Sequence, residues 1–325
     1  MGQIVEGDWI ASQPLVDLDG ADLRRHIEKY SGICNFDLAR KIEEWRTNGI
    51  VVFEGVVDKG LIDALLQDIE YLRKHYMDFD LLAEFKGIQR HLRDFTPEEL
   101  ESDGVKFNSI QTISHAAARL SLTPELMQFL RVVFDGAPCA TQSLTFYRGS
   151  QQPIHIDYPY VRAQSKLAHL AATWIPLEDI SPDAGPLAYY PGSHKVDVSG
   201  FFDWGDGSIV LEPDSSRDPT QFADYLYQRM REKGVEPVVY CPRKGDALIW
   251  HGNLAHEGTK IRDNRLTRMS YVTHYTSLDA YPLSFLKPGA PGKGGVINAE
   301  NGGYVFEHGW QDQLRQLPSI ALKRP

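Results

Sequence analysis

The stretch QSLTFYRGSQQPIHID, residues 142–157, decides the fold, because it joins two short β-rich runs, 142–148 and 154–157, through a turn. Similar runs separated by Gly, Pro and Asp recur downstream, at 167–175, 187–190, 247–250 and 269–275. Many short strands with turn signals between them are typical of a sandwich or barrel. The sequence therefore predicts a mainly β fold with flanking helices, built on a double-stranded β-helix core of the jelly-roll or cupin kind.

The first third of the chain shows helical periodicity instead and is expected to support this core. A helix with an apolar stripe is expected to end at Gly49, and a strand to follow at 50–53. Asp58 is the expected N-cap of the next helix. A third helix is expected to begin with Thr123 as N-cap and Pro124 at its first position.

Length favours one elaborated domain. A chain of 325 residues with 42% hydrophobic residues can bury a large core. We expect a single domain over 1–325, divided into mainly helical support at 1–140, the jelly-roll core at 141–276 and a C-terminal extension at 277–325. A polar, acidic insertion at 195–240, helical at 222–233, is expected to form a lid or a surface loop.

Charge and composition exclude several classes of partner. A formal net charge of -10 disfavours a general affinity for nucleic acid or anionic lipid. No apolar run is long enough to span a membrane, and the N-terminal stretch lacks the basic and apolar regions of a signal peptide. The three cysteines are scattered, so neither a disulfide framework nor a structural zinc site is expected. A reducing, cytoplasmic location fits these features.

A histidine and a carboxylate at the end of the opening stretch predict a metal site. His155 and Asp157 stand two apart on an expected strand, so their side chains share one face. A third ligand must come from elsewhere, and the segment GDALIWHGNLAHEG at 245–258 offers His251 and His256. Two histidines and one carboxylate leave further metal positions open, as suits non-haem Fe(II) oxygenases.

The order of several motifs along the chain adds a family resemblance. The motifs are HxD at 155–157, WIPLEDISPDAGPLAYYPGSHK at 174–195, GDALIWHGNLAHEG at 245–258, Arg268, and NGIVVFEGVVDKGLIDALLQDIEYL at 48–72. Together they resemble the phytanoyl-CoA dioxygenase family of Fe(II)- and 2-oxoglutarate-dependent oxygenases. The resemblance implies that iron is bound by His155, Asp157 and His256, with His251 beside them. It also implies that O2 oxidatively decarboxylates 2-oxoglutarate to succinate while the substrate is hydroxylated.

The same resemblance assigns residues to the co-substrate. It implies that Arg268 holds the far carboxylate of 2-oxoglutarate, because a guanidinium can bind a carboxylate bidentately. Arg262 and Arg265 compete for this role from a turn-like segment, where exposure is the default. The family often carries Ser two residues beyond the distal His, and Gly258 stands there in this chain. Family members that halogenate replace the carboxylate ligand with a small residue, so Asp157 favours hydroxylation.

Five further residues are candidates for the pocket. Trp174 aligns with a residue near the co-substrate in some relatives, and Gln142, rather than Thr145, is expected to face the pocket and contact the co-substrate. Three others are expected to contact a small-molecule substrate. Arg148 would bind an anionic group of the substrate, Tyr158 would form part of an aromatic pocket wall, and His194 would lie at the pocket mouth.

Substrate identity and function class leave alternatives. The acidic insertion, with Asp197, Asp203, Asp206, Glu212, Asp214 and Asp218, would favour a cationic substrate instead. A jelly-roll metalloenzyme that does not use 2-oxoglutarate is one alternative, and Arg268 argues against it. A binding protein on a degenerate scaffold is another, and the complete ligand set argues against that.

Overall fold

The computed structural model describes residues 15, 18–161, 169–201, 221–280, 295–298, 302–307 and 315–322. Its α-helices are α2 (Gly20–Ser31), α3 (Leu38–Asn48), α4 (Lys59–Lys74), α5 (Pro97–Leu100), α6 (His115–Leu120), α7 (Pro124–Phe134), α8 (Tyr158–Val161) and α9 (Gln221–Lys233). Short 3-10 helices are η1 (Tyr76–Asp78), η2 (Leu92–Asp94), η3 (Ile110–Thr112), η4 (Ser193–Lys195), η5 (Ser199–Phe201) and η8 (Pro318–Ala321). No helix in these ranges is both long and apolar enough to cross a membrane.

The strands form two layers. They are β1 (Ile50–Phe53), β2 (Leu82–Phe85), β3 (Ile88–His91), β4 (Lys106–Asn108), β5 (Pro138–Phe146), β6 (Ala171–Pro176), β7 (Leu187–Tyr189), β8 (Val238–Tyr240), β9 (Ala247–His251), β10 (His256–Gly258), β11 (Ser270–Ser277), β12 (Gly295–Asn298) and β13 (Tyr304–Glu307). The major sheet runs β1-β9-β6-β11-β5-β4-β2-β3, with β13 beside β5, and the minor sheet runs β10-β7-β8. In both sheets the pairs are antiparallel except for the parallel pair of β13 and β5. The expected mainly β architecture with flanking helices is therefore confirmed.

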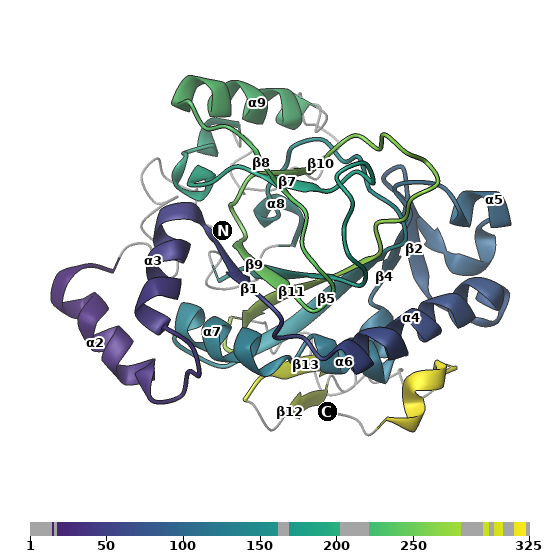
Figure 1. The fold of residues 1–325 in the computed structure, drawn as a ribbon, viewed down its shortest axis with the longest axis horizontal. Helices are drawn as coiled ribbons and strands as arrows, with labels where there is room; N and C mark the ends of the chain where they lie inside the picture. The colour runs from purple at the N-terminus through teal and green to yellow at the C-terminus, as the bar shows by residue number, and fades with distance from the viewer. Residues whose placement is uncertain are drawn as a thin grey trace.

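The major sheet is covered on both faces (Figure 1). Alternate residues of its central strands, such as Ile249 and Tyr271, join the apolar core formed with α3, α4, α6 and α7. The residues between them, such as Trp174, Trp250 and Val272, form a second core with the minor sheet. Because side chains alternate along a strand, each central strand sends one set toward the helices and the other toward the space between the sheets.

Local signals set most of the element boundaries. Gly49 ends α3 in the left-handed conformation at φ 74°, and Asp58 caps α4 by accepting hydrogen bonds from backbone amides of its first turn. Thr123 stands at the N-cap position of α7, but its hydroxyl donates to the carbonyl of Leu120 and makes no cap bond. Pro124 begins that helix, as expected.

The expected strand at 154–157 is absent. His155 forms a single antiparallel bridge to His256, and α8 follows directly at Tyr158. The backbone N–H groups of Asp157 and Tyr158 both donate to the carbonyl of Gly252, at 2.9 and 3.0 Å. These bonds turn the chain away from the sheet, so the HxD segment is an irregular connection rather than a strand.

The N-terminal third contributes to the major sheet as well as covering it. β1 pairs with β9, and β4 pairs with β5, which itself crosses the expected boundary between 140 and 141. The expected insertion at 195–240 includes α9, whereas its acidic residues Asp203, Asp206, Glu212, Asp214 and Asp218 lie outside the described residues.

Candidate metal centre

A pair of backbone hydrogen bonds brings two distant histidines together. The N–H of His155 donates to the carbonyl of His256 at 2.9 Å, and the N–H of His256 donates back at 3.0 Å. Their ring centroids are 4.2 Å apart. This pair of hydrogen bonds, rather than the expected strand, places His155 beside β10 of the minor sheet.

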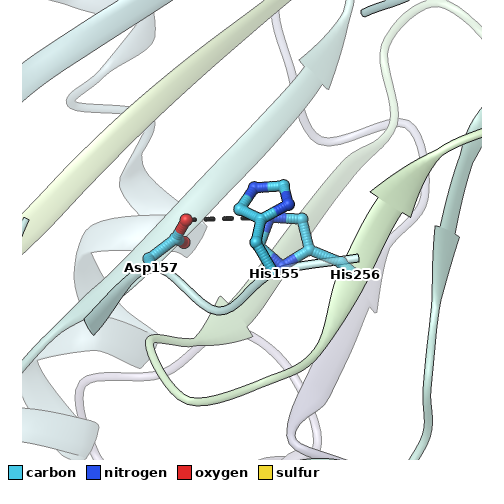
Figure 2. Close-up of side chains that lie close together, drawn as sticks. All are labelled: His155, Asp157 and His256. Carbon is cyan, nitrogen blue, oxygen red and sulfur yellow. Dashed lines mark ion pairs between the residues drawn. The ribbon is translucent and has the colours of Figure 1, made fainter. Parts of the chain in front are cut away.

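His155, Asp157 and His256 form a cluster with metal-binding geometry. One donor atom of each residue lies within 4.8 Å of the donors of the other two. Nε2 of His256 is 3.7 Å from Oδ1 of Asp157, and Figure 2 shows the carboxylate pointing toward the imidazole rings. Separations of this size suit first-row metal–ligand bonds of about 2 Å that meet at one point.

Backbone carbonyls orient both imidazoles. Nδ1 of His155 lies 2.9 Å from the carbonyl oxygen of Pro153, and Nδ1 of His256 lies 2.9 Å from that of Leu254. With Nδ1–H donating in each ring, Nε2 is left as the lone-pair donor. This pattern is common among metal-binding histidines, because the outer hydrogen bond selects the tautomer and fixes the ring.

Electrostatics favour the metal-binding protonation states. Burial, reinforced by neighbouring His256, lowers the pKa of His155 from 6.5 to about 3. For Asp157, burial would raise the pKa, but the nearby His256 and His274 outweigh it, so the pKa lies below its usual 3.8. At neutral pH the site therefore offers a neutral imidazole and an ionised carboxylate, which is what a divalent cation requires.

A small cavity of about 60 Å³ extends from the cluster into the space between the sheets. Arg268 and Trp174 line it together with the three clustered residues. The Arg268 side chain is buried, and its guanidinium carbon lies 5.3 and 5.7 Å from the ring centroids of Phe146 and Trp174. By contrast, the side chains of Arg262 and Arg265 are 74% and 90% exposed and pair with aspartates.

A larger groove of about 780 Å³ opens outward from the same cluster. His155, Asp157 and His274 line both the cavity and the groove. Gln142, expected to contact the co-substrate, lines the groove and not the cavity that Arg268 lines, and Thr145 is buried and lines neither space. The outer walls come from the β2–β3 hairpin, Lys106, the segment 150–153 and Tyr160.

Three expected substrate contacts lie elsewhere in the structure. His194 is fully buried, against the ring of His251 at 5.4 Å and beneath Gly49, so the expectation that it lies at the mouth is wrong. Arg148 donates to two backbone carbonyls, of Asn264 and Leu266, and lines neither space. Tyr158 is buried in an apolar cluster behind the site and also lines neither space.

One residue of the site was not expected from the sequence. His274 lies on β11 and lines both spaces. Its even spacing from Arg268 and Val272 along the strand was the available signal, because alternate residues share a face.

A jelly-roll sheet pair with two histidines and one carboxylate between its layers defines the class of non-haem iron oxygenases. The model of the phytanoyl-CoA dioxygenase family, PhyH, matches residues 45–270, and the chain belongs to this family.

Relatives of known sequence carry the same family description. The chain is 24% identical over 278 residues to the phytanoyl-CoA dioxygenase domain-containing protein 1 homolog of Caenorhabditis elegans, covering 74% of this chain and 90% of that protein. It is 22% identical over 270 residues to the Danio rerio protein of that description, covering 72% and 88%.

Solved structures share the fold. The α-ketoglutarate-dependent epimerase SnoN from nogalamycin biosynthesis superimposes with a TM-score of 0.55 at 16% identity, covering 83% of this chain and 97% of SnoN. EctD from S. alaskensis, solved with 2-oxoglutarate and 5-hydroxyectoine, gives a TM-score of 0.55 at 16% identity, covering 82% of each chain.

Proposed function

We propose that this protein is an Fe(II)- and 2-oxoglutarate-dependent dioxygenase that hydroxylates a small molecule and releases succinate and CO2. The observation that carries the proposal is the cluster of His155, Asp157 and His256, with the buried cation of Arg268 in the wall of the adjoining cavity. Iron would be held by the three clustered residues, since both Nδ1 atoms lie against backbone carbonyls and leave the Nε2 atoms to face the metal. SnoN is an α-ketoglutarate-dependent epimerase and EctD was solved with 2-oxoglutarate, which supports the choice of co-substrate.

The inner cavity and the outer groove would bind different ligands. The co-substrate would occupy the inner cavity, where Arg268 would pair with its far carboxylate and Trp174 would line its side. The substrate would occupy the outer groove, where Gln142 and Tyr160 would contact it. Iron with 2-oxoglutarate and O2 supplies the oxidation, and the residues of the chain bind, orient and exclude water.

Three features support the finer parts of the proposal. Asp157 stands where a small residue would be needed for halogenation, which favours hydroxylation. The groove carries charges of both signs, including the ion pair of Lys106 and Glu84 at 2.9 Å, which suits a small polar metabolite. Strands from both the first third and the core join one sheet, which favours a single catalytic domain over 1–325.

Anaerobic titration tests the proposal directly. Fe(II) and then 2-oxoglutarate are added to the apoprotein, and the visible metal-to-ligand charge-transfer band is recorded before air is admitted and succinate is measured. We expect the band and succinate with the unaltered protein and neither with Asp157→Ala. Absence of the band from the unaltered protein would contradict the use of 2-oxoglutarate.

A further inference from the structure

His274 is a buried polar side chain at the junction of the two spaces. It is 2% exposed and lies on β11, whose backbone pairs with β5 on one side and β6 on the other. Its neighbour two residues earlier, Val272, belongs to the core between the sheets, so His274 projects toward the metal cluster. Nδ1 has no hydrogen-bond partner among the described residues, and the one polar contact of Nε2 is with the carboxylate of Asp157. A buried imidazole with so few partners is unusual unless its polar atoms serve a site.

The two oxygens of Asp157 have different surroundings. Oδ2 accepts a hydrogen bond of 2.6 Å from the indole Nε1–H of Trp250. Nε2 of His274 lies 3.5 Å from the same oxygen, within ion-pair distance. Oδ1 instead faces Nε2 of His256 at 3.7 Å, on the side of the cluster. Two nitrogen donors therefore gather at one carboxylate oxygen, and the other oxygen faces the point where the metal donors converge.

We propose that His274 is a positioning residue that, with Trp250, holds Oδ2 of Asp157 so that only Oδ1 binds the metal. This inference rests on the proposed function. A carboxylate that also bound through Oδ2 would occupy one more metal position. Iron held by three protein donors would keep positions for the 2-oxo acid and for O2. By holding Oδ2 away, His274 would leave room at the metal for both reactants.

Direct metal binding by His274 fits the geometry less well. Only His155, Asp157 and His256 form a group with all donor atoms within 4.8 Å of one another in the described part of the chain. His274 stands outside this group, and its Nε2 lies against Oδ2 of Asp157, whereas Nε2 of His256 lies against Oδ1. Hydrogen-bonding partners of metal ligands typically account for 10–100-fold in metal affinity, which is the scale expected here.

The experiment uses cobalt(II), whose visible bands respond to coordination number, as a probe of the full-length apoprotein. His274→Phe keeps the ring but removes its donor, and His274→Gln keeps a donor. Thr276→Val is the control, because Thr276 is buried on the same strand but lines neither space. Circular dichroism and thermal unfolding confirm that each variant is folded before titration.

We expect His274→Phe to weaken cobalt binding about 10–100-fold and to lower the intensity of its visible bands, as a higher coordination number does. His274→Gln should recover at least part of both, and Thr276→Val should match the unaltered protein. Combining His274→Phe with Trp250→Phe should cost less than the product of the two separate losses, because both donors act on one oxygen.

Two results would overturn the inference while leaving the proposed function intact. One is unaltered cobalt affinity and spectrum in His274→Phe. The other is an equal loss of cobalt affinity in His274→Phe and His274→Gln, which would show that His274 acts only through packing. Failure of the unaltered protein to bind cobalt or Fe(II) would overturn both the inference and the proposed function.

Discussion

Arg268→Met is expected to raise the stability of the ligand-free protein and to abolish tight binding of 2-oxoglutarate. The Arg268 side chain is 3% exposed, and its Nε has no hydrogen-bond partner among the described residues. Glu178 acts on it electrostatically, but that carboxylate already accepts hydrogen bonds from a threonine hydroxyl and a backbone amide. The guanidinium therefore has no carboxylate of its own among the described residues, and it lies beside a cavity that a dicarboxylate would enter.

The magnitude follows from the pKa. Burial lowers the pKa of Arg268 from 12.5 to about 10, which corresponds to about 3 kcal/mol of unfavourable free energy for the charged form. Because the folded pKa lies below the unfolded one, this penalty is fully present below pH 10 and fades as the pH rises toward 12.5. At neutral pH, replacing the charge with an apolar side chain of similar length should recover up to about 3 kcal/mol. Loss of the charge-assisted bonds should weaken 2-oxoglutarate binding by roughly 100-fold.

Two measurements on the same variant separate these effects. Urea unfolding of the ligand-free protein reports the free energy of unfolding, and anaerobic absorbance titration with Fe(II) reports the affinity for 2-oxoglutarate. Arg265→Met is the control, since that side chain is 90% exposed and pairs with Asp263, so both quantities should be unchanged. Wild-type affinity in Arg268→Met would refute the assignment of the carboxylate anchor. A fall in the free energy of unfolding would refute the argument that the charge is unpaired.

Three further perturbations test other parts of the structure. Gly258→Ala should weaken 2-oxoglutarate binding at least tenfold in the same titration, a loss of about 1.4 kcal/mol, because a Cβ there would lie 2.8 Å from the backbone nitrogen of Gln151. Unchanged affinity would mean that residues 150–152 shift without affecting the cavity. Burial lowers the pKa of His194 to about 3, so folding stability is retained above pH 6.5 and should fall by roughly 2 kcal/mol at pH 5 through this histidine. Burial also lowers the pKa of His251, which adds to the fall. Denaturation curves of His251→Phe should show a shallower fall, and an identical fall would remove this explanation. Asp68→Ala should cost about 3 kcal/mol and expose the chain around η8 to protease, because the buried Asp68 carboxylate accepts hydrogen bonds from both α6's cap and η8; wild-type protease resistance would contradict that link.

The element boundaries were largely predictable because their causes are local. A glycine at positive φ ends α3, and a capping aspartate begins α4, both within one turn of the residue concerned. The strand at 154–157 was the exception. Its alternating pattern suited a strand, but the carbonyl of Gly252, far along the chain, captures two successive amides and turns the backbone into α8. A long-range hydrogen bond of this kind leaves no local pattern.

The clustered residues of the candidate site were predictable from their residue types and their order in the sequence. His155, Asp157 and His256 come together as expected, since an imidazole and a carboxylate close in sequence need only one further donor. The substrate contacts were not predictable in this way. His194 follows a turn that suggests a surface position, yet the left-handed backbone of Gly49 leaves room for its ring in the interior.

The sequence by itself determined the mainly β class, the helix caps, and the residue types that can bind a metal and a carboxylate. Only the tertiary structure decided which of these side chains face one another. The central strands are buried on both faces, so apolar residues occupy both alternating sets and the sequence pattern does not show which set faces the metal. His274 and Trp250 acquire their place at Asp157 through the packing of β9 and β11 against the minor sheet, where residues distant in the chain meet at a single carboxylate.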